Sequence, residues 1–440
     1  MRRLALAVAA AFAALGGCIP AASARTPSAA GCPSPVRDAS DLGRLAFVRA
    51  GQLELLEVRD CRVRTVVPSR VEGPVRWSAD GRYLAFGAGA VVAAGGGKVT
   101  YPLGRLAAGW GTGARGWAWS PTGHTLAGVS VSGGVLVGGP GGAARRLLPG
   151  GWGATSLAFA ADGRTLAVSR SLYPNAPPPY HQEVWLIDLR TGQKREIFHL
   201  HKGELAPPWL YGFSLDGRWV IGWEDIQNSS SLAADGLPLI AIPLDGGTAV
   251  PVGKGTLVYG DFLSLCSRAL AYVLNRGGRE VTLGDRIGLA RPPRWLPVEP
   301  AAVASTAKLS FNSPACSPTA TFGLAASVGP ATLDEPLGGE RRSIWLLGSS
   351  GGNWRALEPA APRGSTDELP MWSKDGRWIA FVRTTWSASR QQGVGRLYLL
   401  EIGDEPNARP KLVGPIAGIG STGNYLGHYG WGGQIAWDGG

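Results

Sequence analysis

The chain has 440 residues, of which 45% are hydrophobic and 17% are charged, and it contains 66 glycines, 33 prolines and 17 tryptophans. The apolar fraction is high enough for a large core, which excludes a generic disordered chain and a collagen-like one. The net charge of +11 is spread along the sequence. Because Lys and Arg do not gather with aromatic residues on one element, no nucleic-acid partner is expected. Abundant Gly, Pro and Trp favour short strands joined by turns over long helices.

The N-terminus is predicted to be a signal peptide. Arg2 and Arg3 precede an uncharged stretch that ends at Leu15, which is the order of a charged and an apolar region in a secretory signal. The segment Leu15-Gly16-Gly17-Cys18 resembles the bacterial lipobox, in which the cysteine becomes the lipidated first residue of the mature chain. An ordinary cleavage site at Ala22-Ser23-Ala24 leaves a freely secreted protein open.

We therefore expect residues 1–17 to be removed and residues 18–40 to form a lipidated or flexible lead. The expected location is the bacterial envelope, with a membrane anchor at Cys18, or otherwise a secreted or periplasmic protein. Later uncharged stretches, at residues 125–144 and 309–333, are interrupted by glycine or proline. Membrane attachment is therefore expected only through lipid.

A ten-residue pattern recurs along the rest of the chain. Its first clear copy reads Trp77-Ser78-Ala79-Asp80-Gly81-Arg82-Tyr83-Leu84-Ala85-Phe86, and four more copies with Gly at the fifth position start at Trp119, Phe159, Phe213 and Trp372. Asp-Gly is expected to make a tight turn, because Gly accepts positive φ and the Asp side chain bonds to nearby backbone. The Leu-Ala-Phe part alternates as a half-buried strand does.

The spacing of the pattern predicts the fold. Counting weaker copies, the units start near residues 42, 77, 119, 159, 213, 263, 316 and 372, and intervals of this length are typical of propeller blades. We predict an all-β chain whose residues 41–440 form a single β-propeller of four-stranded blades. Eight blades are expected, and seven remain possible if the weak unit near 263 or the split terminal unit is not independent. Partial copies at residues 43–48 and 434–437 indicate that the two ends close one blade together.

The pattern resembles the TolB-type, or WD40-like, propeller repeat of bacterial envelope proteins, which also occurs in the propeller domains of prolyl-oligopeptidase-type peptidases. The resemblance covers residues 40–437. It implies a propeller that acts as an interaction module. Two departures limit it, because this sequence has no room for the α/β domain that precedes the TolB propeller or for the hydrolase domain of the peptidases.

Four cysteines remain once Cys18 is assigned to the anchor, and an even number in an oxidising compartment allows disulfides. The hypothesis pairs Cys32 with Cys61, which would tie the N-terminal lead to the first blade, and Cys266 with Cys316, which would link two adjacent weak repeats. Four buried free thiols are the alternative. The spacings fit neither a redox motif nor a zinc ligand set, so no metal site and no cofactor are expected.

Two short motifs resemble a catalytic site and a metal site. The string Gly348-Ser349-Ser350-Gly351-Gly352 matches a nucleophile elbow, but the following residues predict the return strand of a hairpin where the elbow needs a helix. His199 and His201 alternate on one strand face with Glu204 as the nearby carboxylate, and a solvated strand end is the favoured interpretation.

Long insertions between the second and third strands of four units are the predicted recognition surface. They span residues 169–182, 224–236, 327–342 and 383–396, and such loops share one face of a propeller. They mix aromatic residues with Arg and His, the kinds of residue that often carry binding energy. The candidate partner-binding residues are Tyr173, Tyr180, His181, Arg383, Trp386 and Arg390. Plain surface excursions without a binding role are the alternative for each loop.

Two functions of different class follow from these patterns. The favoured one is a monomeric, non-enzymatic scaffold of the envelope that binds a protein or peptide through the loop face. The alternative is a secreted hydrolase or lyase acting on glycan or peptide with a site in the channel. It would need an acid/base set, for which Asp225, Asp261 and Asp367 are widely spaced candidates.

Overall fold

The structure is a computed structural model of the whole chain. It describes Val36 and residues 42–107, 116–171, 182–200, 208–224, 237–256, 260–266, 269–274, 286–300, 303, 308–319, 323–330, 341–347, 354–357, 361–389, 391–402, 410–422, 424–425 and 428–438. Among these residues, no helix has the length and apolar character needed to cross a membrane. The expected signal peptide, the lipidation site Cys18 and Cys32 lie outside the described residues.

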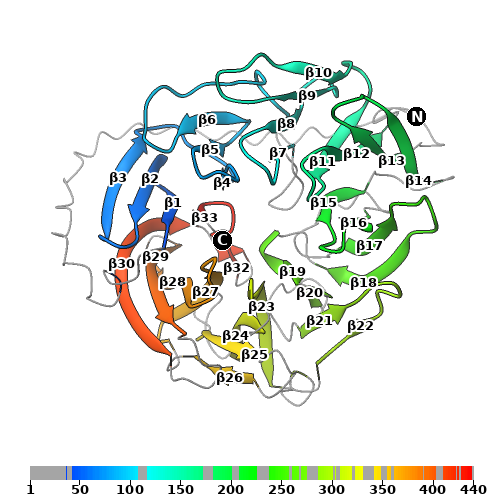
Figure 1. Cartoon of the computed structure of the whole chain (residues 1–440). Helices are drawn as coiled ribbons and strands as arrows, with labels where there is room; N and C mark the ends of the chain where they lie inside the picture. The colour runs from blue at the N-terminus through cyan, green and yellow to red at the C-terminus, as the bar shows by residue number, and fades with distance from the viewer. Residues whose placement is uncertain are drawn as a thin grey trace, which may run out of the picture.

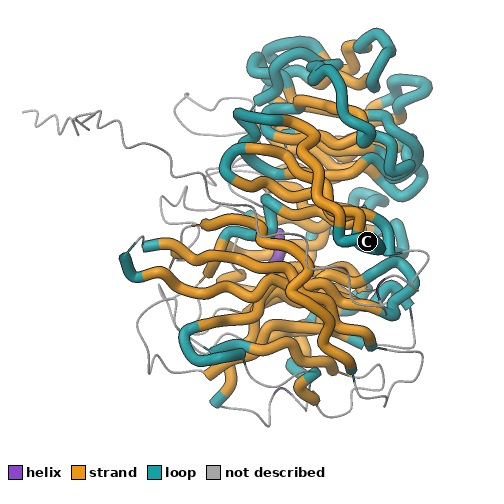
Figure 2. Tube along the Cα trace, turned by 90° about the vertical axis from the view of Figure 1, so that its left-hand side faces the viewer, coloured by secondary structure: helices purple, strands orange, loops and turns teal. Residues whose placement is uncertain are grey.

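Eight antiparallel blades form a closed ring, and the centre of the ring, which the innermost strands face, is here called the channel (Figure 1). The edge-on view shows strands through the thickness of the ring and loops toward its two faces (Figure 2). The all-β class and the larger of the two predicted blade numbers are therefore confirmed. The strands follow one another outward in each blade, except in blade 1, where the innermost strand comes from the C-terminus.

The strand bounds of the first four blades are as follows. Blade 1 has β33 (Ile435–Trp437), β1 (Arg44–Arg49), β2 (Gln52–Glu57) and β3 (Arg62–Val67); blade 2 has β4 (Val75–Trp77), β5 (Tyr83–Phe86) and β6 (Ala90–Ala93), with a bridge from Val91 to Thr100. Blade 3 has β7 (Trp117–Trp119), β8 (Leu126–Val129), β9 (Val135–Gly138) and β10 (Arg145–Leu148); blade 4 has β11 (Ala154–Phe159), β12 (Thr165–Ser171), β13 (Gln182–Asp188) and β14 (Lys194–Leu200).

The second half of the ring has the same plan. Blade 5 has β15 (Trp209–Phe213), β16 (Trp219–Trp223), β17 (Leu237–Pro243) and β18 (Val250–Thr256); blade 6 has β19 (Leu263–Cys266), β20 (Ala269–Leu274), β21 (Arg286–Ala290) and β22 (Pro297–Val298). Blade 7 has β23 (Leu309–Cys316), β24 (Leu324–Pro330), β25 (Ser343–Leu347) and β26 (Trp354–Ala356); blade 8 has β27 (Ser365–Trp372), β28 (Trp378–Ser387), β29 (Gln392–Glu401) and β30 (Lys411–Thr422). A short helix η1 (Gly260–Phe262) and a small hairpin, β31 (Asn424–Tyr425) and β32 (His428–Tyr429), complete the set.

The repeat turns of blades 2, 5 and 8 are each held by one serine and one aspartate. In blade 2, Ser78 Oγ donates to Asp80 Oδ1 at 2.7 Å and accepts the backbone N–H of Tyr83 at 3.0 Å. The same bonds recur from Ser214 in blade 5 and Ser373 in blade 8. This local bonding explains why Ser, Asp and Gly recur at fixed positions in the sequence pattern.

The turn also lowers the pKa of its carboxylate. Burial raises the pKa of Asp80, but hydrogen bonds from Ser78, from the His124 ring and from the backbone of Arg82 together hold it below its usual value. A carboxylate with a depressed folded-state pKa contributes stability above its unfolded pKa of about 3.9. That contribution is lost as the pH falls through the folded-state pKa.

The repeat tryptophans join neighbouring blades through their indole nitrogens. Trp119 donates to the Arg76 carbonyl at 3.2 Å, and Trp372 donates to the Ala315 carbonyl at 2.9 Å. Trp77 donates to the Ala436 carbonyl of blade 1 at 3.0 Å. In each case the acceptor is the residue just before the aromatic position of the preceding unit. The tryptophan of one repeat therefore recognises the inner strand of the blade before it.

The ring closes where β1 pairs with β33, in the register Leu45–Trp437, Ala46–Ala436 and Phe47–Ile435. Arg44 stabilises this junction. Its guanidinium forms an ion pair with Asp438 and also donates a hydrogen bond to the Gly81 carbonyl. Gly81 has a φ of +66°, and an added Cβ there would lie 2.7 Å from Asp438 Oδ1. The predicted closure of one blade by both ends of the chain is confirmed.

A disulfide joins Cys266 in blade 6 to Cys316 in blade 7, with the two Cα atoms 5.3 Å apart, as the sequence predicted. Cys316 occupies the aromatic position of its unit, because it pairs with Leu324 as Trp77 pairs with Leu84. In blade 6 the corresponding pair is Leu265 and Leu270, two residues beyond the unit start expected at 263. Blade 7 has no tryptophan at this position, and the disulfide links it to blade 6 in place of the indole bond. Cys61 is also disulfide-bonded.

The indole bonds predict a stability effect. Trp372→Phe removes the bond to Ala315 and leaves its partly buried carbonyl with one partner fewer, so we expect the free energy of unfolding to fall by about 0.5–1.5 kcal/mol. Chemical denaturation followed by circular dichroism measures this. The matched change Trp386→Phe in the same blade affects an indole that, among the described residues, makes no such bond to a neighbouring inner strand. An equal loss in both variants would contradict the role given to the indole N–H.

Candidate functional site

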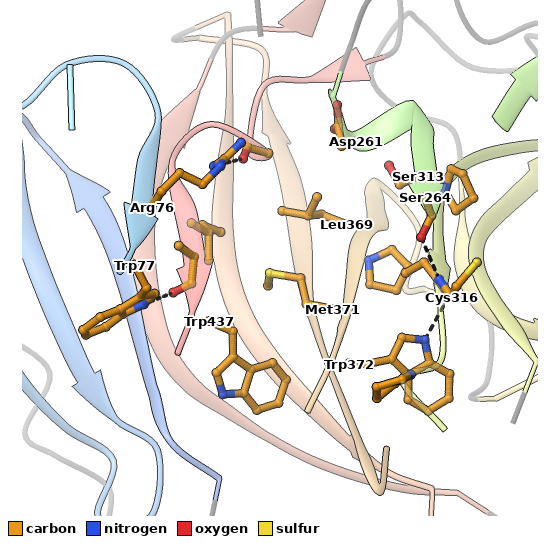
Figure 3. Close-up of a pocket in the computed structure, with 17 residues that line it drawn as sticks. Arg76, Trp77, Asp261, Ser264, Ser313, Cys316, Leu369, Met371, Trp372 and Trp437 are labelled. Atoms are coloured by element: carbon orange, nitrogen blue, oxygen red, sulfur yellow. Dashed lines mark hydrogen bonds between the residues drawn. The ribbon is translucent and has the colours of Figure 1, made fainter. Parts of the chain in front are cut away.

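The channel contains a cavity of about 440 Å³. The inner strands of blades 1, 2, 7 and 8 line it, together with Asp261 and Ser264 of blade 6. Most of the wall is apolar, with Leu369 and Met371 projecting from β27 (Figure 3). Met371 is the single methionine of the chain apart from Met1.

A loop just before β33 crosses one end of the cavity. Its Gly432 carbonyl lies 3.4 Å from Arg76 Nη1 of blade 2, and a Cβ at Gly432 would lie 3.0 Å from the Cβ of Asp261 in blade 6. The Gly433 carbonyl also accepts the N–H of Val75 at 3.0 Å. The C-terminal segment thus spans the channel from blade 2 to blade 6, and the Arg76 and Asp261 side chains lie at this end.

Three tryptophans, Trp77, Trp372 and Trp437, surround the other end of the cavity (Figure 3). The indole N–H of Trp437 donates to the Leu42 carbonyl at 2.6 Å, and those of Trp77 and Trp372 form the inter-blade bonds described above. Because these bonds fix the rings, this end of the cavity is rigid. The disulfide at Cys316 lines the adjacent wall.

Two inner strands carry a strained residue where they face the cavity. Ser313 in β23 has a φ of 47° and Leu369 in β27 has a φ of 52°, and each lies in a break of the strand register. Left-handed backbone at residues other than glycine is uncommon and tends to occur at functional sites. These two bulges in adjacent blades both line the cavity.

Arg76 and Asp261 are the only ionisable side chains among the described residues that line this cavity. Asp367, which the catalytic alternative places in the channel, is not part of the lining, and Asp225 lies outside the described residues. The described lining therefore brings one carboxylate to the cavity and not a pair. Its chemistry is that of a largely apolar binding pocket with one positive and one negative group at the capped end.

The prediction that residues 383–396 form an inserted loop was wrong. These residues belong to a long hairpin, in which β28 and β29 pair from Trp378–Glu401 to Ser387–Gln392. Arg383 pairs with Arg396 within the sheet, and its guanidinium binds both oxygens of the fully buried Asp367 at 2.6 and 2.7 Å. Arg383 is therefore an internal partner of Asp367 and not an exposed binding residue. The alternation of apolar residues in the sequence stops before the ends of β28 and β29, so it did not reveal the full length of these strands.

Trp386 lies in the same hairpin and is half-buried. Its ring lies 6.4 Å from that of Tyr429, which precedes the loop across the channel. Nearby, Trp431 donates its indole N–H to Thr384 Oγ1 at 2.9 Å. The hairpin thus packs against the C-terminal segment, so the part that Trp386 plays in the described structure is structural.

The other candidate loop residues, Tyr173, Tyr180, His181 and Arg390, lie outside the described residues, as does the Gly348–Gly352 string. The strands on either side of that string, β25 and β26, pair antiparallel, which is the geometry of a hairpin. His201 also lies outside.

The expected surroundings of His199 were wrong. His199 lies in β14 beside two carboxylates, Glu196 at 3.0 Å and Glu183 at 3.9 Å, whereas the sequence pointed to Glu204. Glu183 comes from the neighbouring strand β13, directly opposite His199, and sequence order alone does not reveal such a cross-strand partner.

Solved structures with similar folds match most of the chain. A crystal structure of a eukaryotic initiation factor matches with a TM-score of 0.53 and 12% identity, covering 90% of this chain and 88% of that chain. The chain is an eight-bladed β-propeller. Two other similar structures are dipeptidyl peptidase 4 of Porphyromonas gingivalis (TM-score 0.48, 11% identity, 83% of this chain and 59% of that chain) and a putative TolB of Agrobacterium tumefaciens (0.33, 13%, 88% and 91%). No family model and no curated protein matches the sequence.

The buried ion pair in blade 8 gives a test of the corrected assignment. Arg383→Ala leaves the Asp367 carboxylate buried without its main partner, and we expect the free energy of unfolding to fall by about 3–5 kcal/mol. The double variant Arg383→Met with Asp367→Leu removes both charges and should lose clearly less. Urea denaturation of both variants measures the difference. If Arg383→Ala left stability unchanged, the pair would not support the blade.

Proposed function

We propose that this propeller is a non-enzymatic binding scaffold of the bacterial envelope that engages a protein or peptide partner through one loop face. The observation that carries the proposal is the asymmetry of the two faces. Four long connections, between β12 and β13, β16 and β17, β20 and β21, and β24 and β25, leave the blades on the same face. The opposite face carries the short Ser-x-Asp-Gly turns. Long loops on a rigid support are the usual place for recognition.

The rigidity of the ring supports this proposal. Indole bonds, a disulfide and the closure at β1 and β33 fix the positions of the blade ends from which the long connections start. A pre-ordered support lowers the entropic cost of binding, since the blades themselves need not rearrange. The channel cavity lies behind the loop at Gly432, at the end of the ring where the long connections leave the blades.

A secreted hydrolase or lyase acting on glycan or peptide is the alternative. Its discriminating residue is Asp261, the single carboxylate among the described residues of the cavity lining. The similarity to a peptidase structure at 11% identity concerns the fold alone.

Replacement of the long connections tests the loop-face proposal. Exchanging residues 225–236 for a short glycine-containing linker should leave the melting temperature nearly unchanged, because lengthening or shortening a surface connection costs little. Recovery of the partner captured by the intact protein from envelope extracts should fall. The control is Arg82→Glu, an exposed change on the turn face, which should keep both properties. Partner capture lost with Arg82→Glu and kept with the shortened connection would place the surface on the turn face.

The proposed location depends on Cys18, at the end of the lipobox-like segment. Cys18→Ser should move the protein from the membrane fraction to the soluble fraction, because the lipid chains supply the attachment. Fractionation with immunodetection measures the change, and Cys61→Ser serves as the control for loss of a different cysteine. A mature N-terminus at Arg25 would contradict the lipid anchor.

A further inference from the structure

Two glutamates and a histidine meet on the outer half of blade 4. The ligand atoms of Glu183, Glu196 and His199 all lie within 4.8 Å of one another. They lie on β13 and β14, the two outermost strands of the blade (Figure 1). These two strands lie on the outer side of the ring, away from the channel cavity, because β11 is the innermost strand of this blade.

A bulge in β14 brings the three residues to one face. Glu183 pairs directly with His199, and Trp185 pairs with Glu196, with a register break between Val184 and Trp185. In a regular strand, residues three apart such as Glu196 and His199 would point to opposite faces. The extra residue changes this phase, so both side chains join Glu183. Bulges often re-aim a side chain in this way next to functional sites.

Glu183 is held in a fixed orientation. It is 5% exposed, and its Oε2 accepts hydrogen bonds from Arg170 at 3.0 Å and from the Trp185 indole at 2.6 Å. These two donors leave Oε1 on the side of His199 Nδ1, at 3.9 Å. A carboxylate that ligates a metal is commonly oriented by outer hydrogen bonds of this kind.

We propose that Glu183, Glu196 and His199 form a binding site for a divalent transition-metal ion, of which Zn²⁺ is the natural probe. Zinc binds carboxylate oxygen and imidazole nitrogen at about 2.0–2.2 Å, which sets neighbouring ligands in a tetrahedral site about 3.3 Å apart. The distances of 3.0 and 3.9 Å from His199 Nδ1 bracket this value.

Charge and chemistry favour a transition metal over Ca²⁺ or Mg²⁺. One imidazole with two carboxylates is a mixed nitrogen and oxygen set, whereas Ca²⁺ and Mg²⁺ prefer oxygen ligands alone. Two carboxylates and one guanidinium carry a net charge of −1, so the group attracts a cation. Glu196 and His199 also line a cavity of about 570 Å³ between blades 4 and 5. A metal held by three protein ligands therefore keeps an open position toward this cavity.

Calorimetric titration of the untagged, chelator-treated protein with Zn²⁺ tests the site. The wild type should bind one ion here, and His199→Ala and Glu196→Gln should each weaken binding by about tenfold or more. Both residues are partly exposed, so the variants should fold, which circular dichroism checks. Binding should also change the fluorescence of Trp185, since its indole is bonded to Glu183.

The chain supplies a matched control in His124, which pairs with Asp80 at 2.7 Å and has no second carboxylate in such a group among the described residues. His124→Ala should leave Zn²⁺ affinity unchanged. The proposal is overturned if the wild type binds no Zn²⁺, if His199→Ala and Glu196→Gln bind it as tightly as the wild type, or if Ca²⁺ occupies the same site equally well.

Discussion

The pairing of β1 with β33 is the constraint on which the whole ring depends. A propeller hides its strand edges only if the last blade meets the first, and here the innermost strand of blade 1 is supplied by the C-terminus. The Arg44–Asp438 ion pair and the indole bond from Trp77 to Ala436 act at this junction. The loop that leads to β33 also crosses the channel at Gly432. The same C-terminal segment therefore closes the ring and caps the cavity.

Neighbouring blades are joined by a small set of directed bonds in addition to apolar packing. The buried clusters contain residues of adjacent blades, such as Ile344 of blade 7 with Phe381 of blade 8, and this packing is not directional. The indole N–H of each repeat tryptophan adds direction, because it selects one carbonyl of the preceding inner strand. Cys316 replaces tryptophan in blade 7, and its disulfide keeps the two inner strands together.

Breaks in strand register position side chains in the channel cavity and in the group of Glu183, Glu196 and His199. Bulges at Ser313 and Leu369 line the channel cavity, and a bulge in β14 turns Glu196 toward His199 and Glu183. Glu183, Glu196 and His199 are close in space in this way, although they lie on two strands and a regular strand would put Glu196 and His199 on opposite faces.

The sequence by itself determined the all-β class, the blade period and the closure by both ends, because these follow from local turn chemistry and from repeated spacing. It left the pairing of Cys266 with Cys316 open beside four free thiols, and the structure decided for the disulfide. The sequence did not determine that Arg383 is bound to Asp367, that residues 383–396 continue as strands, or that Glu183 lies beside His199. Those facts depend on register and on contacts between strands. Only the tertiary structure decides them, because a shift of one residue in a strand moves a side chain to the other face.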